Sequence, residues 1–218
     1  MLQFGLACEG VTDHAVIENI LCGFYNDKNL KNEISVYQPL FDKTQQKQLD
    51  GEFGGWEELL KYLSTKRFRE SVINTKYMIV QIDTDISEHI NFGVSQYELS
   101  IEELIIRVIE RLIAQIDMKR EFYQEHKYKI IFAISVHSLE CWILPIYKNY
   151  KNEKIVSCFN ALQRESQKIK VLKNYNSYNE LSREFLKHKR VINIASKNSS
   201  FQIFLDKLPK NIDKKEKR

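Results

Sequence analysis

The chain is poor in residues that interrupt secondary structure and lacks common nucleotide-binding motifs. Its 218 residues include 3 prolines and 7 glycines, and there is no internal repeat, Gly/Ser linker or proline-rich tract. Neither a GxxxxGK(S/T) loop nor a GxGxxG motif occurs, so the sequence shows no obvious means of binding ATP. A chain of this length can bury a full core, and we expect one domain with an appendage.

Long apolar runs are also absent. Stretches such as Ile130 to Ile134 are far shorter than the roughly 20 residues that span a bilayer. The first residues, Met-Leu-Gln-Phe-Gly-Leu-Ala, carry no basic side chain and lead straight into an acidic motif, which is unlike a signal peptide. We therefore expect a cytoplasmic protein that does not associate with a membrane.

The cysteines are few and widely separated. No CxxC pair occurs, which disfavours a structural zinc site. In a cytoplasmic protein such thiols are most simply small buried hydrophobes. A zinc site that combines His14 or His137 with a nearby cysteine is a minor alternative, because the spacing lacks short ligand pairs. The four cysteines are Cys8, Cys22, Cys141 and Cys158.

The net charge of the chain is weakly positive. The formal charge is +4 at pH 7, a bias that is compatible with nucleic-acid binding without being diagnostic of it. Much of this charge comes from the tail, Lys207 to Arg218. A basic tail is more often a solvated end than a binding arm, although it can hold a phosphate backbone loosely.

Apolar periodicity predicts alternating strands and helices over the first two thirds of the chain. Ser100 and Glu103 form a capping box in front of the clearest helix, which continues to Ile116. This alternation predicts an α/β fold with a mainly parallel four-stranded sheet flanked by helices. The expected strands are residues 2–8, 34–40, 77–82 and 129–136, and the other expected helices are residues 13–24 and 56–63.

The pattern changes from about Pro145 onwards. This last third is lysine-rich and asparagine-rich, and its apolar spacing predicts a helical C-terminal extension. We expect the extension to pack on an edge of the sheet or to form a lid over its crevice. Helices are expected at residues 155–169, 178–186 and 201–208.

Acidic residues directly follow two of the expected strands. Glu9 comes after the first strand, and Asp83 and Asp85 come after the third. The carboxyl ends of parallel strands line the ligand crevice, so these carboxylates are expected to meet at one edge of the sheet. Like charges that lie close together resist joint ionisation unless a cation neutralises them. The pattern predicts a divalent-metal site of the kind Mg²⁺ prefers, with a solvated turn as the simpler alternative for the two aspartates.

The loop after Glu9 leads directly into the first expected helix. Free backbone amides at a helix N-terminus favour anions, and Gly10 is expected to relieve steric restriction where the chain turns. Thr12 or Asp13 is expected to cap the helix. Asp13 can alternatively reach the same cation as Glu9, and the sequence favours neither role over the other.

These motifs carry a resemblance to a known family. Glu9-Gly-Val-Thr-Asp13 after a hydrophobic strand, with Asp83-Thr-Asp85 after a later one, resembles the TOPRIM domain of primases, type IA and type II topoisomerases, RecR proteins and OLD-family nucleases. The resemblance implies a Rossmann-like TOPRIM catalytic domain over residues 1–144, followed by the helical extension with its basic tail over residues 145–218. It also implies that Glu9, Asp83 and Asp85 hold Mg²⁺ or Mn²⁺.

A later motif, Ser138-Leu-Glu-Cys-Trp142, is similar to one in small TOPRIM proteins that are close to OLD nucleases and to effectors of bacterial anti-phage systems. In those relatives an acidic residue near the end of the fourth strand adds to the site, which assigns a catalytic and metal-binding role to Glu140. Trp142 is more simply a core residue. His137 is best interpreted as a partly buried, hydrogen-bonded residue, with a proton shuttle beside Glu140 as the alternative.

A hydrolytic site of this type also needs a cation near the scissile phosphate. OLD-type nucleases imply a lysine late in the domain, and Lys197 is the candidate, with Lys189 and Arg190 as weaker ones. Lysines are abundant in this part of the chain, and most of them are expected to solvate the surface.

The leading hypothesis is therefore a metal-dependent nuclease that cuts DNA or RNA as an effector of anti-phage defence. OLD proteins carry an ATPase domain that this chain lacks, which leaves room for a separate ATPase partner, and a homo-oligomer is also possible. The main alternative is a non-catalytic RecR-like scaffold that binds nucleic acid or a partner ATPase. Primase-like or topoisomerase-like chemistry is disfavoured, because a topoisomerase needs a tyrosine nucleophile on another domain and the chain leaves little space for one.

Overall fold

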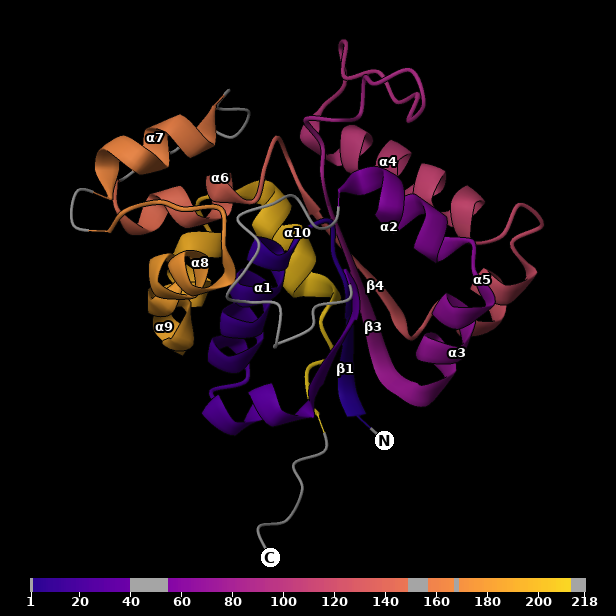
Figure 1. Cartoon of the computed structure of the whole chain (residues 1–218), viewed down its shortest axis with the longest axis horizontal. Helices are drawn as coiled ribbons and strands as arrows, with labels where there is room; N and C mark the ends of the chain where they lie inside the picture. Colours follow the sequence, from indigo (N-terminus) through magenta and orange to yellow (C-terminus); the bar gives the residue numbers. More distant parts are fainter. Residues whose placement is uncertain (1, 40–54, 149–156, 167–168, 213–218) are drawn as a thin grey trace, which may run out of the picture.

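The protein has an α/β architecture built on four parallel strands, as predicted (Figure 1). The computed structural model describes residues 2–39, 55–148, 157–166 and 169–212. The strand order is β2-β1-β3-β4, so the first and third strands lie side by side at the centre of the sheet. The strands are β1 (Leu2–Ala7), β2 (Ile34–Gln38), β3 (Thr75–Asp83) and β4 (Ile130–Ser135).

Successive residues of the central strands enter two separate hydrophobic clusters. On β3, Ile79 joins one cluster, whereas Met78 and Val80 join the other. On β4, Ile131 and Phe132 divide in the same way. Because neighbouring side chains of a strand point to opposite faces, both faces of the sheet are apolar and both are covered by helices.

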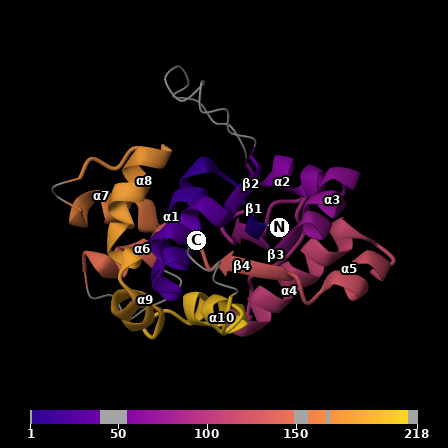
Figure 2. The same cartoon turned by 90° about the horizontal axis from the view of Figure 1, so that it is seen from below.

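Each face of the sheet has its own helical layer (Figures 1 and 2). One face is covered by α1 (Val11–Phe24) and α10 (Ser199–Lys207), and α10 packs directly on β4. Helix α4 (Ile101–Ile116) is the longest helix of the other face, and its capping box of Ser100 and Glu103 is present as predicted. The remaining helices of that face are α2 (Trp56–Leu63), α3 (Lys66–Asn74) and α5 (Glu121–His126).

The C-terminal region is helical, as predicted, and forms a second layer outside α1. Helices α8 and α9 and the 3-10 helix η4 pack against α1, while α10 packs on the sheet. The region therefore covers one face of the sheet, and α10 lies on the edge strand β4. The other elements of this region are α6 (Glu140–Ile143), a 3-10 helix at Leu144–Ile146, α7 (Cys158–Glu165), α8 (Tyr175–Leu181), η4 (Arg183–Leu186) and α9 (His188–Ala195). A further 3-10 helix, at Lys28–Glu33, lies between α1 and β2.

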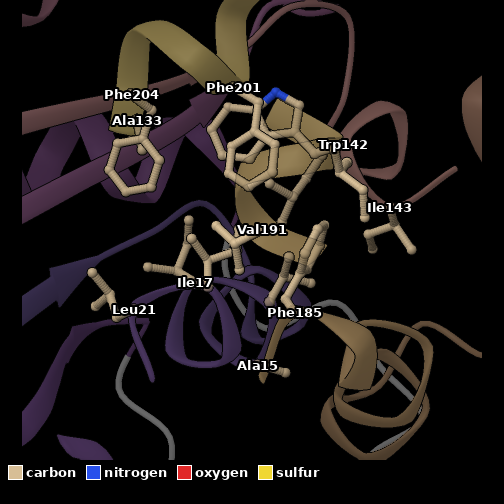
Figure 3. Close-up of a cluster of buried hydrophobic side chains, with 14 of the residues drawn as sticks. Ala15, Ile17, Leu21, Ala133, Trp142, Ile143, Phe185, Val191, Phe201 and Phe204 are labelled. Carbon is tan, nitrogen blue, oxygen red and sulfur yellow. The ribbon is translucent and has the colours of Figure 1, made fainter. Parts of the chain in front are cut away.

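Trp142 is a core residue, as the sequence suggested. Its side chain is fully buried, and its ring stacks on Phe201 and Phe204 with centroid distances of 4.8 Å and 5.6 Å (Figure 3). Its indole Nε1 donates a hydrogen bond of 2.9 Å to Ser200 Oγ. Trp142 lies in α6 and its partners lie in α10, so one hydrophobic cluster joins the sheet, α1 and the C-terminal helices.

Several elements differ from the prediction. Helices α3, α5 and α9 were not expected, because with 9, 6 and 8 residues each is too short for its apolar spacing to give a strong signal. The helix expected at residues 178–186 is two elements, α8 and η4, and at their junction Ser182 Oγ donates to the carbonyl of Tyr178 at 2.6 Å. Residue 40 of the second expected strand, residues 155–156 and 167–168 of the helix expected at residues 155–169, and the tail beyond residue 212 lie outside the described residues.

Two of the four cysteines form a disulfide, which corrects the expectation of four separate thiols. Cys141 and Cys158 link α6 to α7 with a Cα–Cα distance of 5.2 Å, whereas Cys8 and Cys22 are free. All four are buried, as expected. The sequence separation of 17 residues gave no local signal for the pair. Within the described residues, no helix is long and apolar enough to cross a membrane.

Candidate functional site

Glu9 and Asp83 lie against one another at the carboxyl edge of the sheet. Glu9 follows β1, Asp83 ends β3, and these strands pair in parallel with Ala7 opposite Val80. The backbone N–H of Asp83 donates a long hydrogen bond of 3.4 Å to Glu9 Oε2. The structure thus brings together two carboxylates that the sequence placed at the ends of separate strands.

The side chain of Gln81 hydrogen-bonds to both acidic residues. It is fully buried, its Nε2 donates to Asp83 Oδ1 at 2.9 Å, and its Oε1 accepts from the backbone N–H of Glu9 at 3.4 Å. Nε2 also lies 3.4 Å from Ser135 Oγ on the neighbouring strand β4. Sequence reasoning assigned no role to Gln81, although a single polar residue inside an otherwise apolar strand is a signal that points to a buried polar contact.

Asp13 is both a helix cap and a neighbour of the other acidic residues. Its Oδ2 accepts from the backbone N–H of Gly10 at 2.7 Å, and Thr12 Oγ1 donates to its Oδ1 at 3.2 Å. The N-cap of α1 is therefore Gly10, and the prediction of Thr12 or Asp13 as N-cap was wrong; Asp13 is the third helical residue and reaches back to the cap. Gly10 has extended backbone (φ −136°), and a Cβ there would lie 3.4 Å from Asp13, so the expected steric need for glycine was also wrong.

The environment of Glu9 disfavours its ionised form. Burial, followed by the charge of Asp85, raises the pKa of Glu9 from 4.5 to about 7, and the charge of Glu140 adds to this effect. The hydrogen bond from the Asp83 amide and the charge of Lys173 act in the opposite direction. Glu9 would therefore gain from a nearby cation.

The same direction holds for Asp13 and Asp83. The pKa of Asp13 is raised well above its usual value by burial and then by the charges of Glu9 and Glu140. The pKa of Asp83 is also well above its usual value, because of burial and the charges of Glu9, Asp13, Glu140 and Asp85, in that order. The five predicted acidic residues therefore act on one another as a single electrostatic cluster, which we call the acidic cluster: Glu9, Asp13, Asp83, Asp85 and Glu140.

Asp85 occupies the exposed side of this acidic cluster. Strand β3 ends at Asp83, and the following loop is held to β4 because Asp85 donates its backbone N–H to the carbonyl of His137 at 3.0 Å. Burial and the charge of Glu140 raise the pKa of Asp85, whereas the charge of His137 lowers it. Asp85 is exposed and Asp83 is half-buried, so the two aspartates have different access to solvent.

His137 links the loops that follow β3 and β4. It has a left-handed backbone (φ 66°), and its N–H donates to Thr84 Oγ1 at 2.7 Å. Its Nε2 accepts from the backbone N–H of Ser157 at 3.0 Å, at the start of α7. His137 is thus half-buried and hydrogen-bonded, as interpreted from the sequence, although its Nδ1 has no hydrogen-bond partner within the described part of the chain.

Glu140 is the first residue of α6 and receives a side chain from the C-terminal region. The hydroxyl of Tyr178, in α8, donates a short hydrogen bond to Glu140 Oε1. Tyr178 is buried, and burial together with the charge of Glu140 raises the pKa of its phenol. Sequence reasoning missed Tyr178, because its place on an amphipathic helix indicates only that it faces the interior.

Lys173 is the lysine whose charge acts on the acidic cluster. It lowers the pKa of both Glu9 and Asp85, and its Nζ lies 5.4 Å from the centroid of the Phe159 ring. Lys197 is exposed in the turn between α9 and α10, and it lines a separate cavity of about 610 Å³ together with Glu102. Of the weaker candidates, Arg190 pairs with Glu184 at 3.2 Å and Lys189 is exposed.

The donor atoms of the acidic cluster suit Mg²⁺ or Mn²⁺, because both ions prefer carboxylate oxygens. Within the described residues, no three Asp, Glu, His or Cys side chains stand in a ready-made metal-binding arrangement. The acidic side chains would therefore move closer together around an ion. The zinc alternative is disfavoured, because Cys141 is in the disulfide and the His14 ring is already hydrogen-bonded to the carbonyl of Gln38 at 2.8 Å.

No known protein family, curated protein sequence or solved structure matches the chain.

Proposed function

We propose that the chain is a nuclease that uses Mg²⁺ or Mn²⁺ to hydrolyse phosphodiester bonds of DNA or RNA. The observation that supports this most directly is the contact between Glu9 and Asp83, in which the Asp83 amide donates to the Glu9 carboxylate where two neighbouring parallel strands end. Burial and neighbouring negative charges raise the pKa values of both groups, so their ionised forms are disfavoured. A divalent cation would offset that cost.

Each residue of the acidic cluster has a role in the proposed reaction. Glu9, Asp83 and Asp85 would hold the ion, with Asp13 and Glu140 at its sides, and Gln81 would keep Asp83 in place through its 2.9 Å hydrogen bond. Bound metal would supply activation of water and stabilisation of the leaving oxygen. Lys173 would offset negative charge on the phosphate, the role that sequence reasoning gave to Lys197.

The biological setting is proposed on the resemblance alone. Small TOPRIM proteins of this type resemble effectors of anti-phage defence, so we propose a cytoplasmic enzyme that acts on host or phage nucleic acid under the control of a separate ATPase. A homo-oligomer is compatible with this proposal.

In the cytoplasm the Cys141–Cys158 disulfide would form only under oxidising conditions, because that compartment keeps thiols reduced.

Nuclease activity is tested with the purified chain, plasmid DNA, total RNA and Mn²⁺. We expect cleavage by the wild type and loss of cleavage in the Asp83→Ala, Asp85→Ala double variant. Asp206→Asn is the matched control, because Asp206 is an exposed carboxylate on α10 that bonds only Gln202 among the described contacts, at 2.8 Å. Equal activity of the wild type and the double variant would contradict the catalytic proposal.

The second candidate function is a non-catalytic scaffold that binds nucleic acid or a partner ATPase. It is favoured by one observation, the lack of a ready-made group of three metal ligands within the described residues. Calorimetry with millimolar Mg²⁺ separates the two candidates. A nuclease predicts binding to the wild type and weakened binding to Glu9→Gln, whereas a scaffold predicts no difference between them.

A further inference from the structure

We propose that Tyr178 positions Glu140 for metal binding, so that the C-terminal helices complete the site. This inference rests on the proposed function and extends it to a residue outside the region in which the acidic motifs lie. Tyr178 belongs to α8, whereas the acidic cluster is built on β1, α1, β3 and α6.

The contact between Tyr178 and Glu140 is placed where it can act on the whole acidic cluster. The phenol donates to Glu140 Oε1, and the charge of Glu140 acts on all four other members of the cluster. Tyr178 is 1% exposed, so water does not compete for its hydroxyl. With Oε1 engaged by the phenol, rotation of the carboxylate is restricted and Oε2 remains for an ion.

Tyr178 is itself held in place by α1, the helix that carries Asp13. Asn19 Nδ2 donates to the carbonyl of Asn179 at 3.0 Å and to Ser182 Oγ at 2.8 Å. Ser182 Oγ donates to the carbonyl of Tyr178 at 2.6 Å. Asn19 and Ser182 are buried, so these bonds fix the register of α8 against α1. The position of the phenol is therefore coupled to α1 by a buried hydrogen-bond network.

A second tyrosine, Tyr147, makes a hydrogen bond to α8 that does not involve the acidic cluster. The hydroxyl of Tyr147 donates to the carbonyl of Leu181 at 2.9 Å, and that carbonyl carries no metal-binding function. Both Tyr147 and Tyr178 are anchored at α8, and both would lose only a hydroxyl in a Tyr→Phe variant. Tyr147→Phe is therefore a matched control for Tyr178→Phe.

Mn²⁺ affinity measured by calorimetry tests the inference, with thermal unfolding of each variant in chelator as a check of folding. Groups that orient metal ligands typically change metal affinity by about 10-fold to 100-fold when they are removed. We expect Tyr178→Phe to weaken Mn²⁺ binding by at least about 10-fold and Tyr147→Phe to leave it unchanged. In a Glu140→Gln background, the additional change Tyr178→Phe is expected to have little effect on Mn²⁺ affinity, because the carboxylate that it positions is gone.

Three outcomes separate this inference from the proposed function. Wild-type affinity in Tyr178→Phe, or an equal loss with and without Glu140, overturns the role of Tyr178 and leaves the nuclease proposal standing. Mn²⁺ binding that depends on Tyr178 without any cleavage of nucleic acid supports the positioning role and overturns the nuclease. A wild type that binds no Mn²⁺ overturns both.

Discussion

Glu9 and Asp83 are separated by 74 positions in the chain, yet the amide of Asp83 donates to the carboxylate of Glu9. That donor and the charge of Lys173 do not fully offset the burial of Glu9 and the charges of Asp85 and Glu140, so the pKa of Glu9 stays raised. The protein without metal therefore carries unfavourable electrostatic energy at this edge of the sheet, and its stability should depend on pH and on divalent ions.

The first prediction concerns the metal-free protein, which should become less stable as pH rises from about 5 to about 8. The pKa of Glu9 is about 7 in the folded protein and 4.5 ordinarily, so between these values the folded state holds a proton that the unfolded chain releases. The pKa values of Asp13 and Asp83 are raised in the same direction. At about 1.4 kcal/mol per pKa unit, Glu9 alone contributes up to about 3 kcal/mol.

Urea denaturation in the presence of chelator measures this effect. The slope of unfolding free energy against pH should flatten in Glu9→Gln, and Mn²⁺ should raise the stability of the wild type most at high pH. A stability that rises between about pH 5 and about pH 8 would show that the acidic cluster is not strained in this way.

Gln81→Leu should destabilise the protein by about 1–3 kcal/mol, because it leaves the Asp83 carboxylate and the Glu9 amide without a buried partner. Gln3→Leu is the matched control. Gln3 is 2% exposed, and its Nε2 has no hydrogen-bond partner among the residues described, so leucine there should be neutral or stabilising. Chemical denaturation of both variants gives the comparison, and equal effects would contradict the role of Gln81.

Ser200→Ala should also lower the unfolding free energy by about 1–3 kcal/mol. Its hydroxyl accepts from Trp142 Nε1 at 2.9 Å and lies 3.4 Å from the amide of Val136, so both buried donors would lose this acceptor. Ser196→Ala, at an exposed serine that bonds only a nearby carbonyl among its described contacts, should change stability by less than about 0.5 kcal/mol. A Tm difference between the two variants in thermal unfolding checks the prediction.

Gly23→Ala should be strongly destabilising, because a Cβ at Gly23 would lie 1.7 Å from the carbonyl oxygen of Phe185. The obstacle is backbone of η4, so the helix pair would have to separate, at a cost of at least about 2 kcal/mol. Gly10→Ala has room for its methyl group at 3.4 Å and should fold normally. Similar losses of soluble, folded protein for both variants, measured by circular dichroism, would argue against this packing.

Reduction of the Cys141–Cys158 disulfide should lower the stability of the wild type. With a sequence separation of 17 between the cysteines, the chain-entropy account gives about 3 kcal/mol. Thermal unfolding with and without a thiol reductant measures the difference. The Cys141→Ser, Cys158→Ser variant should show no response to the reductant, and an equal response would place the effect elsewhere.

The sequence predicted those parts of the fold that depend on local patterns. The four strands and α4 were placed correctly because their apolar residues run regularly through each element. The start of α4 is also marked by a clear signal, the capping box at Ser100. The placement of acidic residues after β1 and β3 followed from the topology of parallel sheets. Predicting these features requires only the neighbouring residues in the sequence and the rule that parallel strands end at the same edge of a sheet.

Contacts between distant segments could not be predicted in the same way. The Tyr178 hydroxyl and the Cys158 sulfur each need a partner near the end of β4, and nothing in their own neighbourhoods specifies it. Lys173 is one of many lysines in its region, and only the packing of the C-terminal helices gives it influence over Glu9. The resemblance to OLD-type nucleases therefore led to Lys197, whereas the charge that acts on Glu9 and Asp85 is that of Lys173.

The stacking of Trp142 on Phe201 and Phe204 has a consequence for how the molecule unfolds. These rings lie on opposite sides of residue 145, where the helical pattern of the sequence begins, so a fragment that stopped there would leave the indole and the neighbouring face of β4 open to water. We therefore expect the sheet and its C-terminal helical cover to melt cooperatively, as one thermodynamic unit that cannot be shortened to the part that carries the acidic cluster.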